Sequence, residues 1–533
     1  MEKFLRKIQK QTTKKLAVLE SEEKKRMTVA IYSPEEKLLI TKKVREYVLA
    51  KFTDEEVSPL KLNGKEESKV DLDVAFWVAG ELRASAILAR ELSLVEALAL
   101  CTERALHDGR FRPLEQKELS KLRIELTFFD GLWRPVSDEQ IKKNIIDSTA
   151  GYVALLKDQP MAWYLPMVYN AINFRNLTEL WDHLRFEKGG FSKEEAEEVS
   201  LYMFSTTGWI ESVQMSEVLP LDGPIVFHHV MKKDISMIRD SSVEWMLRQE
   251  HSPGFFSSKL SPNMLQTGSV DWVRLGFTAA TFAEIGVRER RDDLLMSSQR
   301  IDRVLERELE KTLFISKEEK ALAMIYAGHS LLWKGEGVHA EHWLNQSKHE
   351  VKEDHMSPIA ILQSTMLSLR LKKNEMHCRK SFSYFYAEWQ ERNETAQLAL
   401  YPELLALALT LARVTGKTSY QEKAFTIGDW YCKQQNPDGS FPLSLGRNQP
   451  YVRGSGKIME VLSLLPERYE GSLIKGLKYI GRMQYTEENI FHIPEIQKTA
   501  FLGGFRHDVL NREAWIDSAG HVGLALSRWQ SSK

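Results

Sequence analysis

The stretch WYCKQQNPDGSF at residues 430–441 predicts the end of a helix, then a tight turn, then a buried aromatic residue. A similar stretch, WMLRQEHSPGFF, occupies residues 245–256, and a weaker copy, with no proline or glycine between its glutamine and its phenylalanine, runs from 479 to 491. In all three, an aromatic residue is followed by a glutamine and then by a phenylalanine. We interpret them as an internal repeat, which indicates an architecture of repeated helical units.

Aromatic markers of this kind recur about 40 to 50 residues apart in the C-terminal part of the chain. The markers are Trp245, Trp343, Trp389, Trp430 and Tyr479, with Leu294–Leu295 dividing the one double-length gap. Between them lie more apolar segments, which we expect to be inner helices, at 272–285, 319–333, 358–371, 401–414, 456–465 and 516–529. Six outer helices alternating with six inner helices predict an all-α (α/α)6 toroid of six helical hairpins over residues 225–533.

The preceding region, residues 33–214, predicts a separate α+β domain. Ser33-Pro34 starts a helix, because serine caps the first turn and proline fits the first helical position. The strings VDLDVAFWVAG at 70–80 and LRIELTFF at 122–129 alternate and are rich in β-forming residues, so we expect strands there. We expect residues 193–204 to be helical, residues 220–224 to connect the domains, and residues 1–32 to form one charged helix.

Five motifs of this first domain occur in the order typical of the AMMECR-type family (AMME chromosomal region candidate gene family). They are the SPEE helix start, GELRASA at 80–86, DGRFRPLEQKEL at 108–119, LRIELTFF and WYLPMV at 163–168. The resemblance covers about 33–211 and implies a fold more than an activity. The family usually has Leu-Arg-Gly-Cys-Ile-Gly where this chain has Leu-Arg-Ala-Ser-Ala-Ile at residues 82–87. Ser85 stands in place of the family's cysteine, so chemistry of that cysteine is not expected here.

The predicted ring of hairpins resembles the six-hairpin toroid superfamily. That superfamily includes certain glycoside hydrolases, polysaccharide lyases and the N-acylglucosamine 2-epimerase group. The run QQNPDGSF is also similar to the QW-type turn of terpenoid cyclases, although the Asp-x-Asp-Asp acid motif of those enzymes is absent from this part of the chain. The resemblance implies a carbohydrate-like ligand, with a terpenoid-cyclase-like enzyme as a third alternative.

The composition excludes several other classes of protein. A formal net charge of -1 over 533 residues gives no overall electrostatic attraction for nucleic acid. The sequence contains no run of roughly 18 apolar residues, so membrane insertion is not expected. The first 27 residues lack a signal-peptide core, so we expect a cytoplasmic protein. The three cysteines stand far apart, no histidine cluster has a third ligand, and no nucleotide-binding glycine motif occurs. We therefore expect no metal and no cofactor; the oligomeric state stays open.

The ligand site of the toroid is expected where the inner helices begin, because helix N-termini present free N–H groups. Glu403 and Asp517 are the candidate acid–base pair for a glycosidic bond. His521 lies four residues after Asp517 on the same helix face, so a hydrogen bond between them could tune it as a base. The expected substrate-binding residues are Trp272, Arg274, Tyr401, Arg453, Lys457 and Arg506.

A structural role is the alternative for each of these residues, as helix caps, ring-closing contacts or ion pairs. In the first domain, a polar cleft is expected to contain Arg83, Ser85, Arg110 and Arg112, with arginines that bridge strand ends as the alternative. The leading hypothesis is a protein whose toroid binds a small molecule or oligosaccharide, with its processing left open. The alternative is a non-catalytic binding or scaffold protein.

Overall fold

The computed structural model describes residues 32–53, 56–129, 132–157, 159–262, 270–309, 311, 315–393, 401–441 and 450–531. The charged helix predicted over residues 1–32 lies almost wholly outside these ranges. The chain forms two compact units. Unit 1 is Met1–Phe227 with Glu487–Glu495, and unit 2 is His228–Thr486 with Ile496–Lys533. No described helix combines the length and apolarity needed to cross a membrane.

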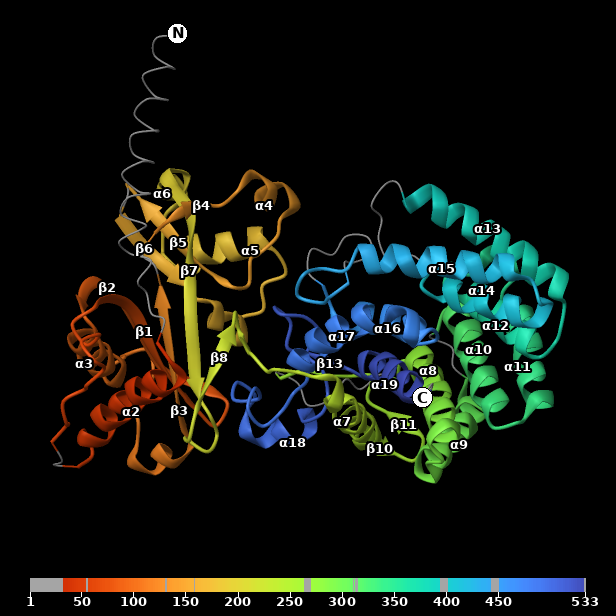
Figure 1. Ribbon diagram of the computed structural model, residues 1–533, viewed down its shortest axis with the longest axis horizontal. Coiled ribbons are helices and arrows are strands. Elements are labelled where there is room, and N and C mark those ends of the chain that lie inside the picture. The colour runs from red at the N-terminus through yellow and green to blue at the C-terminus, as the bar shows by residue number, and fades with distance from the viewer. Residues whose placement is uncertain are drawn as a thin grey trace, which may run out of the picture. The chain divides into compact units, whose positions relative to one another are not determined.

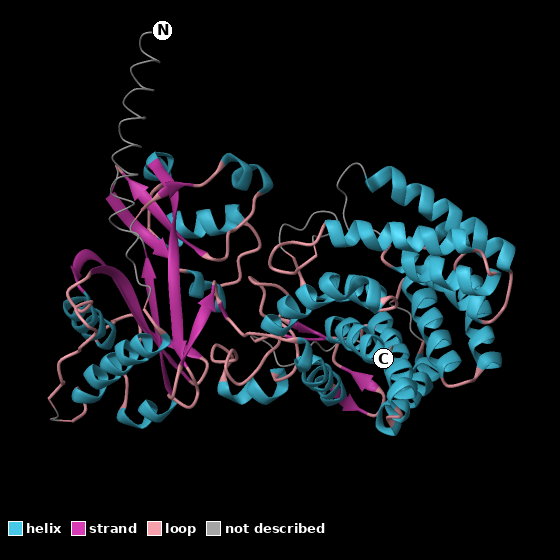
Figure 2. Ribbon diagram, in the orientation of Figure 1, coloured by secondary structure: helices cyan, strands magenta, loops and turns pink. Residues whose placement is uncertain are grey.

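Unit 1 is an α+β domain built on one antiparallel sheet (Figure 2). The strand order is β2-β1-β3-β7-β5-β6, and β4 and β8 also pair with β7. The strands are β1 (Lys69–Val78), β2 (Glu81–Ser93), β3 (Leu122–Phe129), β4 (Arg134–Pro135), β5 (Ala150–Leu156), β6 (Gln159–Tyr164), β7 (Val199–Glu211), β8 (Val218–Asp222) and β9 (Ile225–Val226). The α-helices are α2 (Pro34–Ala50), α3 (Leu94–Leu106), α4 (Asp138–Lys143), α5 (Leu177–Asp182) and α6 (Lys193–Glu198).

The main core of unit 1 lies between the sheet and helices α2 and α3. Ser33 caps α2 in a reciprocal capping box with Glu36, as the Ser-Pro start predicts. Alternate residues of β1, among them Leu72, Val74 and Phe76, are fully buried against these helices. The residues between them therefore face the other side of the sheet.

Two expectations for unit 1 are corrected by the structure. The predicted helix over 193–204 ends at Glu198, and residues from Val199 onward belong to β7, the strand that joins β3 to β5. Residues 220–224 do not connect the domains, because they lie in the β8–β9 hairpin of unit 1.

Unit 2 is an all-α toroid, as the spacing of the aromatic markers predicts (Figure 1). In the described residues, the inner helices are α8 (Trp272–Glu289), α10 (Lys317–Trp333), α12 (Pro358–Arg370), α14 (Glu403–Thr415), α16 (Val452–Leu462) and α19 (Ile516–Ser531). Each packs against the next, and α19 packs against α8, so the inner ring is closed.

The outer helices carry the aromatic markers on which the prediction rests. They are α7 (Ile235–Arg248), α9 (Asp292–Glu308), α11 (Gly337–Glu350), α13 (Glu375–Asn393), α15 (Thr418–Lys433) and α17 (Pro466–Met483). The ring is joined where α7 packs against α19 and where β12 (Lys259–Leu260) pairs with β13 (Ala514–Trp515). Two short elements complete the unit, the hairpin of β10 (Glu250–Ser252) with β11 (Phe255–Phe256) and the helix α18 (Lys498–Phe501).

The repeated turn at 430–441 ties one hairpin to the next. Gln435 donates from Nε2 to the carbonyls of Gly439 and Ser472, both at 2.9 Å, and so links the turn to α17. Phe441 is buried behind it, and its N–H donates to Ser455 of α16. Gly439 has a φ of +91°, which only glycine adopts without strain.

Replacing Gly439 with alanine is expected to lower the free energy of unfolding by about 2–4 kcal/mol. A Cβ there would lie 2.0 Å from the carbonyl oxygen of Lys475, in addition to the strain of the positive φ. Gly416→Ala is the matched control, because Gly416 has a φ of +68° and open space around a Cβ. Urea denaturation should give a cost of about 1 kcal/mol for the control; equal costs would show that the contact with α17 is unimportant.

Candidate functional site

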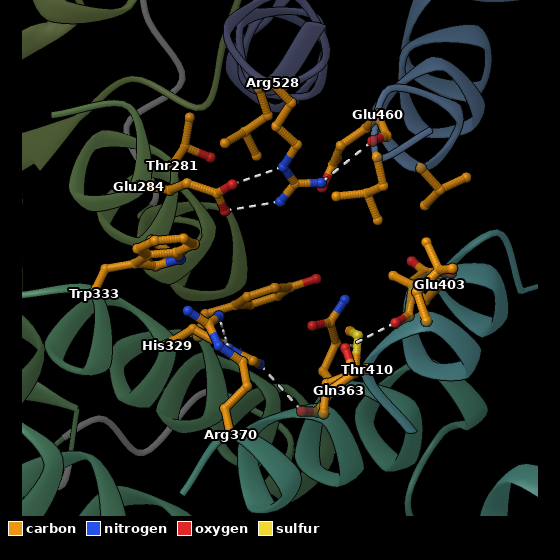
Figure 3. A pocket seen from close by; sticks show the side chains of 18 of the residues that line it. Thr281, Glu284, His329, Trp333, Gln363, Arg370, Glu403, Thr410, Glu460 and Arg528 are labelled. Carbon is orange, nitrogen blue, oxygen red and sulfur yellow. Dashed lines mark hydrogen bonds and ion pairs between the residues drawn. The ribbon is translucent and has the colours of Figure 1, made fainter. Parts of the chain in front are cut away.

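A cavity of about 590 Å³ lies within the inner ring of unit 2 (Figure 3). All six inner helices contribute to its wall, and it extends from Glu403, the first residue of α14, to Arg413 near the end of the same helix. Its charged side chains are Glu284, Arg288, Arg370, Glu403, Arg413, Glu460 and Arg528. Most of them come from the C-terminal halves of their helices, the end opposite to the mouth that the sequence suggested.

Arg528 of α19 joins two carboxylates across one side of the cavity. Its Nε and Nη2 donate to Glu284 at 2.6 and 2.8 Å, and its Nη1 donates to Glu460 at 3.0 Å (Figure 3). Burial alone would raise the pKa of Glu284, but the charge of Arg528 lowers it to about 2. Burial would also raise the pKa of Glu460, but Arg528 and His521 together lower it. Both carboxylates are therefore ionised at neutral pH.

Arg370 of α12 faces the same cavity without a carboxylate partner among the described residues. Its guanidinium lies 4.4 Å from the ring centre of Trp333, and its Nη1 is 3.5 Å from Nδ1 of His329 (Figure 3). Burial lowers the pKa of Arg370 to about 10, so it keeps its charge at pH 7. This arginine is available to an anionic group of a ligand.

His329 holds Arg370 in place as a neutral side chain. Burial and the charge of Arg370 lower the pKa of His329 to about 3. Its Nε2 lies 3.1 Å from the carbonyl oxygen of Gln363, which can only accept, so the proton is assigned to Nε2. Nδ1 is then the acceptor that faces Arg370.

Glu403 is the predicted catalytic residue that the structure does place in the cavity wall. It is buried, and Lys457 of α16, another predicted residue, donates to its Oε1 at 3.4 Å. Its Oε2 is buried without a hydrogen-bond partner among the described residues. Glu403 is thus a cavity carboxylate that no arginine neutralises.

Asp517 does not form the expected pair with Glu403 across the cavity. Asp517 is buried outside the cavity wall, where Arg274 and Arg453 each donate to its Oδ2 at 3.0 Å. Both arginines also stack on Trp515, at 4.4 and 5.8 Å from its ring centre. Burial would raise the pKa of Asp517, but the two arginines lower it. This geometry suits a structural ion cluster better than a general acid.

His521 does not form the expected hydrogen bond with Asp517. Its Nδ1 lies 2.6 Å from Glu460 of α16, and its ring packs 4.3 Å from that of Phe277. The pKa of His521 is lowered by burial, against the opposing charge of Glu460. Glu460 of the neighbouring helix is therefore the hydrogen-bond partner of His521, in place of Asp517 on the same helix.

The other predicted binding residues of the toroid lie outside the cavity wall. Trp272 is half-buried at the start of α8. Tyr401 precedes α14 with a φ of +64°, and its hydroxyl lies 3.4 Å from the carboxylate of Glu388. Arg506 is buried and donates to the carbonyls of Asp508 and Val509, which makes it a loop-stabilising residue.

The four candidates in unit 1 separate into two groups. Arg83 is buried, forms an ion pair with Glu118 and donates to the carbonyl of Arg112 at 3.0 Å. Arg112 itself pairs with Glu118 at 2.9 Å, so these two arginines hold the segment after α3 in place. Ser85 and Arg110, in contrast, line a cavity.

In the described ranges, no group of three or more His, Cys, Asp or Glu side chains is arranged to hold a metal ion. The three cysteines, Cys101, Cys378 and Cys432, are free thiols. The cavity residues Glu284, His329, Arg370, Glu460 and Arg528 were absent from the sequence-based candidates. Their common signal is a polar side chain inside an otherwise apolar inner helix.

No family model matches the sequence, and no curated protein matches it. Among solved structures, a D-mannose isomerase is similar with 11% identity over 57% of this chain and 98% of its own, at a TM-score of 0.41. The cellulase Cel9M of C. cellulolyticum is similar with 10% identity over 56% and 98%, at a TM-score of 0.35. An uncharacterised protein from Pyrococcus horikoshii is similar with 16% identity over 36% and 98%, at a TM-score of 0.31.

Proposed function

We propose that the toroid binds a small carbohydrate-like ligand that carries an anionic group, such as a sugar acid. The observation that carries this proposal is Arg370, which is stacked on Trp333 and faces the cavity without a carboxylate partner in the described residues. Ionised Glu284 and Glu460 offer acceptors for hydroxyl groups. A wall with so many charged groups disfavours a terpenoid.

Replacing Arg370 with methionine is expected to weaken binding of acidic sugars by about tenfold to a hundredfold. Methionine keeps most of the side-chain length while removing the charge. Calorimetry on the full chain would compare D-glucuronate and D-galacturonate with D-glucose, which lacks the carboxylate. The affinity for glucose, if measurable, should not change.

Arg307→Met is the matched control, because Arg307 is exposed on α9 and, among the residues that the structure describes, pairs only with its neighbour Glu308. Equal affinities of acidic and neutral sugars for the wild-type protein would contradict the anionic part of the proposal. Absence of sugar binding altogether would leave the scaffold alternative as the function of the toroid.

Processing of the ligand is a second candidate, and the unpartnered Oε2 of Glu403 favours it. A buried carboxylate oxygen with a free lone pair can accept a proton from a bound substrate. Glu284 and Glu460 are unsuited to this role, because Arg528 holds both pKa values low. If turnover of an acidic sugar is found, Glu403→Gln should abolish it while binding is retained.

We also propose an AMMECR-type family for unit 1 and a cytoplasmic location for the protein. AMMECR-type membership of unit 1 is supported by the motif order, since GELRASA on β2 and LRIELTFF on β3 pair with the same strand, β1, from its two sides. A cytoplasmic location is supported by three thiols without a disulfide.

A further inference from the structure

Unit 1 contains a cavity of about 490 Å³ on the side of the sheet opposite its main core. Asp73, Ala75 and Trp77 of β1 line it, because they alternate with the core residues of the same strand. Ala75 pairs with Ser85 on β2 and with Glu125 on β3, so three neighbouring strands present one row of side chains to the cavity.

Two buried carboxyl groups form the inner end of this cavity. Asp73 is 2% exposed and Glu125 is 1% exposed. Ser85 donates to Asp73 at 2.9 Å, and Trp77 and Thr127 donate to Glu125 at 2.7 and 3.1 Å. No Lys, Arg or His nitrogen of the described residues lies within 4.0 Å, the limit for an ion pair, of either carboxyl group. A buried pair of acids without a direct ion pair is typical of a site that a ligand completes.

Two cations, Lys188 and Arg110, lie toward the exposed end of the cavity, whose wall also includes the exposed Glu187. Lys188 is exposed there, 5.6 Å from the ring centre of Tyr164, and no carboxylate pairs with it among the described residues. Arg110, with 54% of its side chain exposed, pairs with Asp108 and donates to the carbonyl of Ser85. Between the two ends the wall is aromatic and aliphatic, formed by Trp77, Leu82, Ile87, Trp163, Tyr164 and Leu165.

We propose that this cavity binds a small zwitterion of the α-amino-acid class, with its ammonium group on Asp73 and Glu125 and its carboxylate toward Lys188. An ammonium group has three donors, which suit the remaining lone pairs of two carboxylates. Aromatic walls favour an organic cation. The donor set does not suit a metal ion, because Asp73 and Glu125 are the two buried carboxyls of the wall, Glu187 is exposed, and no three such side chains of the described residues are grouped to hold one.

The test begins with the full-length protein and a thermal-shift screen of the proteinogenic α-amino acids. Calorimetry would then compare the strongest binder with its decarboxylated amine and its deaminated acid, which keep the same carbon skeleton. We expect the amino acid to bind most tightly, the amine about tenfold more weakly, and the acid without measurable affinity.

Variants assign the two ends of the ligand. Asp73→Asn and Glu125→Gln should each weaken binding of the amino acid about tenfold to a hundredfold. Lys188→Met should weaken binding of the amino acid but not of the amine. Glu139→Gln is the matched control, because Glu139 is exposed and its one ion-pair partner in the described part of the chain is Lys143. Arg370→Met should also leave this binding unchanged, which separates the site from that of the toroid.

Two results would overturn the proposal. The first is the absence of any amino acid with a dissociation constant below about 10 mM. The second is equal affinity for the amino acid and its deaminated acid, which would exclude recognition of the ammonium group. The comparison of ligands uses the wild-type protein, so it decides the matter even if a variant fails to fold.

Discussion

Replacing Arg528 with methionine is expected to lower the free energy of unfolding of the toroid by about 3–5 kcal/mol. Arg528 bridges Glu284 on α8 and Glu460 on α16, and both carboxylates are ionised because of it. Without the guanidinium, the buried Glu284 keeps its ion pair with Arg288, whereas Glu460, whose side chain is 16% exposed, loses its arginine. Urea denaturation followed by tryptophan fluorescence would measure the change.

The reason for the large effect can be isolated by removing the carboxylates as well. If the cost arises from charges left without a partner, Arg528→Met combined with Glu284→Gln and Glu460→Gln should recover most of it. Arg307→Met on the exposed face of α9 should cost less than about 0.5 kcal/mol. A cost for Arg528→Met as small as that control, or no recovery in the triple variant, would show that the network does not stabilise the ring.

The architecture of unit 2 could be predicted because each hairpin repeats a local signal. The markers Trp343, Trp389 and Trp430 recur at the spacing of one hairpin, and the segments between them are visibly more apolar. A helix is decided largely by residues within a few turns of one another. The closed ring then follows from the number of repeats, without knowledge of any contact between distant residues.

Strand β7 could not be predicted in the same way. Residues 193–198 do begin a helix, capped by Ser192, and the following Leu-Tyr-Met-Phe continues an apolar pattern that is compatible with either state. From Val199 onward the chain pairs with β3 and β5. Strand pairing depends on partners far away in the sequence, which outweigh local preference.

The candidate site was hardest to predict, because its contacts join distant helices. His521 was assigned to Asp517 from their spacing on one helix, but Glu460 from the adjacent helix is its partner. Glu403 was found because it starts an apolar helix. Glu284 and Arg528 stand within apolar helices, which is a signal, but the sequence does not reveal that they meet.

The register of the sheet hides the second cavity from sequence analysis in a similar way. The alternation of VDLDVAFWV shows that Asp73 and Trp77 share a face. It does not show that Ala75 pairs with Glu125, which brings the second carboxyl to the same place. One residue of register shift would move Glu125 to the core face.

Raising the pH from 5 to 9 is expected to destabilise unit 1 by an amount on the order of 6 kcal/mol. Burial raises the pKa of Asp73 to about 7 and that of Glu125 to about 8. Protonated acids therefore contribute stability that is fully present below about pH 4 and is lost as the pH rises through 7 and 8. In this window the unfolded chain binds fewer protons than the folded one. Hydrogen exchange of β1 and β3 peptides, corrected for intrinsic rates, would measure this loss of stability.

The sign of this effect distinguishes the two carboxyls from the others in the domain. The charged and titratable groups around Asp73 are Arg110, Lys188, Asp108, Cys101 and Glu125, and burial outweighs the two cations. The double variant Asp73→Asn with Glu125→Gln should remove most of the slope between pH 5 and 9, whereas Glu139→Gln should retain it. A slope that persists in the double variant would show that other groups cause the pH dependence.

Because an ammonium ligand binds the ionised pair, a saturating amino acid should restore stability at pH 9 more than at pH 5. If the protonated pair has a purely structural role, the amino acid should not change the stability at either pH.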